Sequence, residues 1–286
     1  MGIQPEKIQE VYQFLTAGNQ PLPQHIDMSV VFGRKSKHLQ NAVLQAVGRS
    51  DGLILCGGID ADAGDLRFYQ NTADYLLGPL IHKRYSYPAE WRVDIAAKSG
   101  IEHAQRSVQF LNDLGKTNLE TVAGISHPTR SLRLGGLLRA EMQRNNLNTD
   151  GLIHHGSDYP FDPENLFDQY EAAREVVRID SYKEDGRRSY LVIPERPTQG
   201  MVQYAKGIMA QLGADFKRQG IKNASTADDT NRFESPFWKI LNSSHGGRMD
   251  AVVECFQSAY LPMGNIVNGF RLGRAALKEL RARAGM

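Results

Sequence analysis

The sequence predicts an α/β protein built on a doubly wound, mainly parallel sheet. From residue 27 onward, short apolar runs of strand length alternate with longer amphipathic stretches of helical length. Parallel neighbours need crossover connections, and right-handed crossovers place helices on both faces of the sheet. After Pro197 the strand-like runs stop and helical patterns continue. We therefore expect a Rossmann-like domain followed by a smaller, mostly helical C-terminal region.

The first segment of the chain predicts an amphipathic helix. Ile8, Val11 and Leu15 recur at helical spacing, and Gly18 with the prolines that follow it ends the pattern. We expect this helix to pack on the outside of the sheet. The chain then divides into an N-terminal helical segment (1–27), a Rossmann-like α/β domain (28–197) and a mostly helical C-terminal region (198–286).

The strands of the predicted sheet are short apolar runs that end at glycine, at proline or at polar residues. They cover residues 28–32, 52–56, 91–95, 121–125, 151–154 and 190–193. Amphipathic stretches between and after them predict helices over 36–47, 66–77, 100–114, 131–145, 163–177 and 201–219. Further helices are expected over 236–241, 248–260 and 271–283, and the polar stretch 222–235 predicts a loop or lid.

The composition is that of a folded globular protein. Apolar residues make up 41% of the 286 residues and charged residues 23%, and the net charge of +2 gives no electrostatic reason to expect nucleic acid or an acidic membrane surface as a partner. The two cysteines, Cys56 and Cys255, match no metal-binding or redox spacing. No basic segment precedes an apolar core at the N-terminus, and no apolar run approaches the roughly 18 residues of a membrane span. We expect a cytoplasmic protein with neither nucleic acid nor a membrane as partner, and its self-association stays open.

Polar residues gather where the predicted strands end, and open parallel sheets bind ligands at the carboxyl ends of their strands. Gly33 and Arg34 follow the strand 28–32, and Gly57, Gly58 and Asp60 follow the strand 52–56. Glycines permit a close backbone approach to a ligand, but they serve equally in turns. Neither turn completes a dinucleotide or phosphate-loop fingerprint, so no specific nucleotide is indicated.

The strand 121–125 ends in a denser polar cluster, which comprises Ser126, His127, Thr129, Arg130 and Arg133. His127 has the chemistry of a general acid or base near neutral pH, and either arginine has the geometry to hold a phosphate or a carboxylate. The alternative is that His127 caps the sheet and the arginines are solvated.

Other acids and histidines also fall at predicted strand ends or helix starts. Glu102 opens a predicted helix, where the helix dipole favours an acid, so a capping role accounts for it without catalysis. His103, His127, His154 and His155 are placed to reach one edge of the sheet, yet they show no metal-ligand spacing, and we expect no metal. The segment 154–158 either contacts the ligand or forms a structural loop, and the segment 245–248 precedes a helix that offers N–H groups to an anion.

Four segments of this chain resemble the YdcF/SanA/ElyC-like family, a group of bacterial α/β proteins classed as a domain of unknown function. The segments are 29–33, 53–59, 102–104 and 127–129, with Arg133 on the following helix, and the resemblance covers residues 28–155. Where members of the family carry asparagine after the glutamate, this chain has His103, and the acids nearest the double glycine are Asp60, Asp62 and Asp65. The resemblance implies a nucleotide-binding-like fold with S-adenosylmethionine as a candidate ligand. Members with an envelope role carry a membrane anchor, and this sequence shows no apolar run of that length. The resemblance is therefore closest to the soluble YdcF-like branch.

Together these observations favour a protein that binds a nucleotide-like or phosphorylated small molecule, as a transferase or a hydrolase. In this hypothesis His127 is the general acid or base, Glu102 orients a hydroxyl or amine, and Arg130 or Arg133 neutralises an anion. The remaining ligand-binding candidates are Gly33, Arg34, Gly57, Gly58, Asp60, Ser126, His103 and His155. Two alternatives stay open. One is a metal-assisted hydrolase that uses His103, His127, His154 or Asp158, and the other is a non-catalytic module that senses its ligand through residues 222–235.

Overall fold

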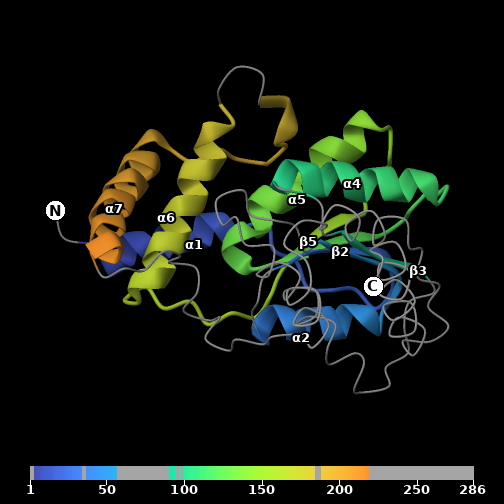
Figure 1. Ribbon diagram of the computed structural model, residues 1–286, viewed down its shortest axis with the longest axis horizontal. Coiled ribbons are helices and arrows are strands. Elements are labelled where there is room, and N and C mark those ends of the chain that lie inside the picture. The colour runs from blue at the N-terminus through green and yellow to red at the C-terminus, as the bar shows by residue number, and fades with distance from the viewer. Residues whose placement is uncertain are drawn as a thin grey trace, which may run out of the picture.

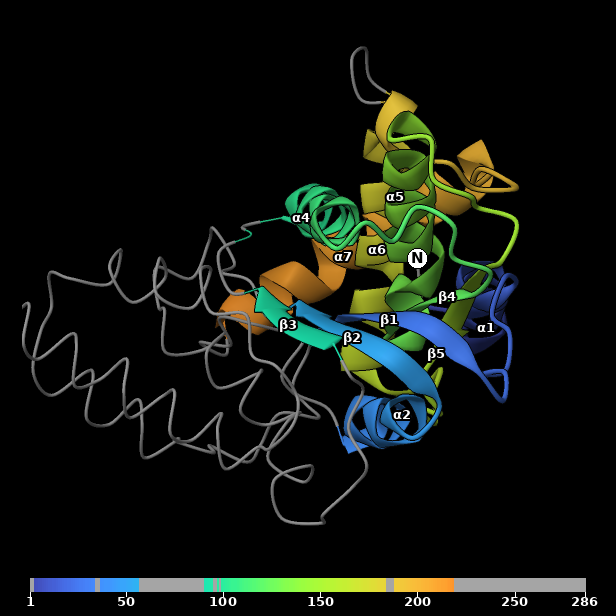
Figure 2. The same ribbon diagram turned by 90° about the vertical axis from the view of Figure 1, so that its right-hand side faces the viewer.

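The computed structural model of the protein describes residues 3–33, 37–56, 90–94, 97, 99–183 and 188–218. These residues form a five-stranded parallel sheet with the strand order β3-β2-β1-β4-β5 (Figure 1). The strands are β1 (Ile26–Phe32), β2 (Ser50–Cys56), β3 (Glu90–Asp94), β4 (Val122–Ser126) and β5 (Leu152–Gly156). The helix α2 (Lys37–Val47) lies on one face, and α4 (Gly100–Asp113) and α5 (Pro128–Arg144) lie on the other (Figure 2). The predicted doubly wound α/β fold is therefore confirmed.

The central strands form because their side chains are buried on both faces of the sheet. Successive residues of a strand point to opposite faces. Val30 therefore joins the core under α4 and α5, whereas Val31 joins the core under α2. Strands buried on both sides read as continuous apolar runs rather than as alternating patterns, which is why the run 28–32 identified β1 from sequence.

A group of helices extends the layer that contains α5. The helix α1 (Pro5–Thr16) buries Ile8, Val11 and Leu15 and packs against α5 and α6 (Leu166–Ser181), and α7 (Gln199–Arg218) lies along α6 (Figure 1). Beyond α1 the chain reaches the sheet edge, where the backbone N–H of Gln20 donates to the carbonyl of His154 at 2.8 Å. The N-terminal helix is thus fixed to its neighbours on α5 and α6, and the segment that follows it pairs with β5.

One predicted strand is wrong. Residues 190–193 do not pair with the sheet, because Arg188–Tyr190 form a short 3-10 helix and residues 191–193 have no regular secondary structure. This segment lies against α5, where the N–H of Val192 donates to the carbonyl of Gly136 at 3.2 Å. A Cβ atom at Gly136 would lie only 2.6 Å from Ile193, so the glycine permits this close approach. The apolar run was real, but the surface that buries it is a helix.

Several helix boundaries also differ from the prediction, and the starts of α5 and α6 have identifiable physical causes. α5 begins at Pro128, three residues before the predicted start at 131, because proline is well suited to the first turn of a helix. α6 begins at Leu166 rather than 163, because the side chain of Asn165 accepts hydrogen bonds from the N–H groups of Phe167 and Asp168 and caps the helix there.

Several predicted elements lie outside the described residues. They are the helices 66–77, 236–241, 248–260 and 271–283 and the loop 222–235. Among the residues that are described, none belongs to a helix long and apolar enough to cross a membrane.

Candidate ligand-binding site

The strand order places a topological switch point between β1 and β4. From β1 the chain continues to β2 through α2 on one face, and from β4 it continues to β5 through α5 on the other face. The two connections therefore diverge at the carboxyl ends of these adjacent strands, which is the place where open α/β sheets bind ligands. Gly33 follows β1, with its N–H donating to the carbonyl of Cys56 at 2.6 Å, and His127 follows β4.

His127 is held rigidly at this position. It is the residue that caps the N-terminus of α5, it is only 3% exposed, and its Nδ1 lies 2.9 Å from the hydroxyl of Thr129. Ser126, at the end of β4, donates its hydroxyl to the backbone carbonyl of His127 at 3.1 Å. The dipole of α5 makes this end of the helix favourable for negative charge. The sequence placed Ser126 and His127 correctly at the end of a strand.

Tyr159 packs against His127, and sequence reasoning did not identify it. The two rings lie 4.6 Å apart, and the Tyr159 ring also meets the edge of His38 at 5.5 Å. The hydroxyl of Tyr159 donates to Asp168 on α6 at 2.6 Å, so the ring is fixed in place. Tyr159 follows the polar segment 154–158 directly, and an aromatic residue just beyond such a strand end is the signal that identifies it.

Arg130 and Arg133 are engaged with carboxylates of α6. Arg133 donates to Glu175 from Nε at 2.6 Å and from Nη2 at 3.3 Å, and Arg130 donates to Glu171 at 2.8 Å. Arg174 and Arg178 join the same cluster through Glu171 and Glu175, at 3.0 and 2.7 Å. The alternative that Arg133 is solvated is therefore wrong, because its side chain is buried between two helices.

Charge balance in this cluster depends on Glu175, which is completely buried. Burial alone would raise the pKa of the Glu175 carboxyl, but the positive charges of Arg133 and Arg178 outweigh it and lower that pKa. Burial alone would lower the pKa of the Arg133 guanidinium, but the negative charge of Glu175 outweighs burial and raises that pKa. Among the described residues, four arginines and two glutamates make up this cluster.

Glu102 and His103 lie in the first turn of α4. The hydroxyl of Ser99 caps this helix by accepting from the N–H of Glu102 at 3.2 Å, in the Ser-x-x-Glu spacing of a capping box. The structure thus shows a capping arrangement around Glu102 of the kind expected from sequence. α4 also approaches α5 closely, since a Cβ atom at Gly100 would lie 3.0 Å from Nη1 of Arg133.

His103 faces the end of β3. Its Nδ1 lies 3.4 Å from a carboxylate oxygen of Asp94, and Arg106 donates to the other oxygen at 2.7 Å. Burial alone would raise the pKa of Asp94, but His103 and Arg106 lower it. Asp94 was not identified from sequence, because a single acid at the end of a short strand carries no pattern.

The neighbouring histidines of β5 point to opposite faces of the sheet. His154 is buried against α5, and burial together with the charge of Arg139 lowers its pKa to about 4. His155 is on the other face, and its Nδ1 lies 2.9 Å from the carbonyl oxygen of Gln20. Because a carbonyl only accepts hydrogen bonds, Nδ1 of His155 carries the proton and its Nε2 is left as an acceptor in the neutral ring. His155 lines a pocket, together with Gly156 and residues of α1.

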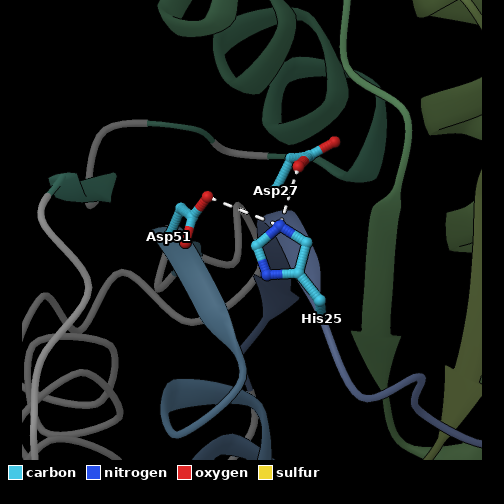
Figure 3. Close-up of side chains that lie close together, drawn as sticks. All are labelled: His25, Asp27 and Asp51. Atoms are coloured by element: carbon cyan, nitrogen blue, oxygen red, sulfur yellow. Dashed lines mark hydrogen bonds and ion pairs between the residues drawn. The ribbon is translucent and has the colours of Figure 1, made fainter.

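A cluster with metal-ligand chemistry lies at the amino ends of β1 and β2, which is the edge of the sheet opposite to His127. Figure 3 shows that His25 points between Asp27 and Asp51, with Nε2 at 3.2 and 3.6 Å from their oxygens. Asp27 also has a structural role, because its other oxygen accepts from the N–H groups of Glu120 and Thr121 and ties β1 to the chain before β4. These hydrogen bonds lower the pKa of Asp27, although partial burial opposes the shift. The group is largely exposed and is distant in the fold from His127.

Four candidates, Arg34, Gly57, Gly58 and Asp60, lie outside the described residues. The structure brings Gly33, Ser126 and His127 to the ends of adjacent strands, places Glu102 and His103 at the start of α4, and puts His155 at the end of β5. No protein-family model matches the chain, and a search of the curated proteins finds no match either. The resemblance to the YdcF/SanA/ElyC-like family therefore stays a prediction.

Proposed function

We propose that the protein binds a nucleotide-like or phosphorylated small molecule at the carboxyl ends of β1 and β4. The observation that carries this proposal is the position of His127 at the switch point of the sheet, at the start of α5. An anionic group placed there meets the positive end of the helix dipole.

In the catalytic form of the proposal, His127 is the general acid or base of a transferase or hydrolase. An acid or base must be held in one orientation to reach the reacting atom. Thr129 and Tyr159 restrain the His127 ring from two sides, by the contacts described above. The arginines act at longer range, because Glu171 and Glu175 already hold their guanidinium groups.

S-adenosylmethionine is the first ligand to test, because the proposed membership of the YdcF-like branch suggests it. The adenosine moiety would lie across the strand ends, near Gly33, as nucleotides do in doubly wound folds. His127 would then lie toward the reacting end of the ligand.

The test is a thermal-unfolding panel on the full chain. It contains S-adenosylmethionine, S-adenosylhomocysteine, common nucleotides, sugar nucleotides and divalent metals. A ligand at about 100 times its dissociation constant stabilises the native state by roughly 2.7 kcal/mol. We expect one nucleotide-like compound to stabilise the wild type and a His25→Gln control, in which the altered side chain is exposed at the opposite edge of the sheet. The same compound should not stabilise His127→Gln.

Other outcomes would replace this proposal. Stabilisation by metals alone would favour the metal-assisted hydrolase. Stabilisation of the wild type and of His127→Gln to the same extent would place the ligand elsewhere. A panel without any effect would remove the nucleotide-like ligand class.

A further inference from the structure

The cluster at the amino ends of β1 and β2 has the spacing of a metal site (Figure 3). It consists of His25, Asp27 and Asp51, whose candidate ligand atoms all lie within 4.8 Å of one another. Nε2 of His25 lies 3.2 Å from the nearer oxygen of Asp27 and 3.6 Å from that of Asp51. A tetrahedral ion with bonds of about 2.0–2.1 Å holds its ligand atoms roughly 3.3–3.5 Å apart. Both distances from the imidazole therefore fit two edges of such a coordination shell.

The pairing of β1 with β2 sets two negative charges side by side. Ile26 pairs with Ser50 in the parallel register, so the next residues of the two strands, Asp27 and Asp51, are neighbours. Like charges on neighbouring positions of a ladder destabilise a sheet. In the described part of the chain, His25 is the only ion-pair partner of these aspartates. Its Nε2 carries at most one proton and donates to one carboxylate at a time, whereas a divalent cation would neutralise both.

The fold fixes the orientation of Asp27 within this group. Its second oxygen accepts from the backbone N–H groups of Glu120 and Thr121 at 2.6 and 2.8 Å, which holds the first oxygen toward His25. Carboxylates that ligate metals are held by outer hydrogen bonds of this kind. His25 lies two residues before Asp27 at the start of the strand, and alternate residues of an extended chain project to the same side. Two of the three ligands are therefore placed by the backbone before any ion binds.

The ligand types select the class of ion. Imidazole nitrogen suits Zn²⁺ and other first-row transition metals, whereas Ca²⁺ and Mg²⁺ prefer shells made of oxygen alone. One nitrogen and two carboxylate oxygens therefore favour Zn²⁺ over Ca²⁺. The side chains of His25 and Asp51 are each 65% exposed, so an ion can enter from solvent and keep water in its remaining position. Three protein ligands and one water are the arrangement of an open zinc site.

We infer that His25, Asp27 and Asp51 form a binding site for Zn²⁺ or a similar first-row divalent ion. A bound ion would join the segment before β1 to β2 and, through Asp27, to the chain before β4, so it would stabilise the amino edge of the sheet. The inference does not depend on the proposed function at His127, which lies at the other edge. Sequence reasoning weighed a metal only for the histidines near the carboxyl ends of the strands, and none of those belongs to this group.

The test is a titration of the metal-free full chain with zinc chloride at neutral pH, followed by isothermal calorimetry and by NMR of the histidine rings. We expect saturable binding that shifts the Nε2 resonance of His25. Asp51→Asn keeps the size of the side chain and should weaken the binding by about tenfold or more. Asp150→Asn is the matched control, because it removes the charge of another exposed aspartate outside the group and should bind Zn²⁺ as the wild type does. Both substitutions are at exposed positions, so neither should change the midpoint of thermal unfolding without metal.

Three results would overturn the inference. The first is that Zn²⁺ does not bind saturably, which would mean that a protonated His25 ring alone holds the two acids together. The second is that Asp51→Asn binds Zn²⁺ as tightly as the control does, and the third is that Ca²⁺ binds more tightly than Zn²⁺. Zn²⁺ binding that persists in His127→Gln and is lost in His25→Gln would assign the ion to this group. The reverse pattern would place it at the carboxyl edge and favour the metal-assisted hydrolase instead.

Discussion

Replacing Glu175 with glutamine should destabilise the protein severely. Glu175 is fully buried and accepts from Arg133 at 2.6 Å and from Arg178 at 2.7 Å. Glutamine keeps the size of the side chain but removes its charge, so Arg133 is left as a buried cation without a carboxylate. Removing one partner of a buried ion pair costs about 3–5 kcal/mol. That is a large part of the roughly 5–15 kcal/mol by which domains are stable.

The assay is urea unfolding at neutral pH, followed by far-ultraviolet circular dichroism. The control is Glu164→Gln, which removes an exposed charge just before α6 and should change the free energy of unfolding by no more than about 0.5 kcal/mol. A loss below about 1 kcal/mol for Glu175→Gln would refute the reasoning, because it would mean that water or another group compensates Arg133.

The same carboxylate predicts an acid-sensitive fold. The pKa of Glu175 is lowered in the folded protein, so its contribution to stability is present above the unfolded pKa of about 4.3 and is lost as the pH falls below it. The wild type should therefore lose more stability than Glu175→Gln when the pH is lowered through this range. Equal losses in the two proteins would contradict the assignment of the charge to Glu175.

Four further substitutions test the packing, a buried histidine and a helix cap. Gly135→Ala should cost about 1–3 kcal/mol by overpacking, because its Cβ would lie 2.5 Å from Cγ of His154. Gly207→Ala has open space around its Cβ and should stabilise α7 by up to about 1 kcal/mol. Equal shifts in the midpoint of thermal unfolding for the two variants would contradict this contrast. The pKa of His154 is lowered to about 4, so the unfolded chain takes up a proton that the folded state excludes, and stability should fall by about 3 kcal/mol between pH 6.5 and 4. His154→Phe should lack this component in urea titrations across the pH range, and an unchanged pH dependence would argue against it. Ser99→Ala should cost about 1 kcal/mol by removing the cap of α4, measured in the same titrations, and no loss would mean that Ser99 does not cap the helix.

Much of the fold was predictable because its elements carry local signals. The strands at Val30, Ile54 and Ile125 are apolar runs buried on both faces, and such runs separated by amphipathic stretches specify crossovers. The segment at Val192 was misassigned for the same reason that the others succeeded. An apolar run predicts that its side chains are buried, but it does not predict whether a sheet or a helix buries them.

The candidate site was predictable only in part. His127 was located because it follows a strong strand signal, and position along a parallel sheet fixes which end its residues occupy. The carboxylate partner of Arg133 was not predictable from sequence, because Glu175 is 42 residues away and only the packing of α5 on α6 brings the two together. The group of His25, Asp27 and Asp51 was likewise not predictable, because only the register of β1 and β2 places Asp51 beside the other two.

The most direct test of the central claim is to observe the imidazole of His127 while the ligand binds. Long-range proton–nitrogen NMR resolves the rings of the eight histidines, and the spectrum of His127→Gln assigns the signal. On addition of the compound that stabilises the protein, we predict a saturable shift of the His127 resonances and unchanged resonances for His25 at the opposite edge of the sheet. A stabilising compound that leaves the His127 ring unperturbed, or that shifts His25 instead, would contradict a ligand site at the carboxyl ends of β1 and β4.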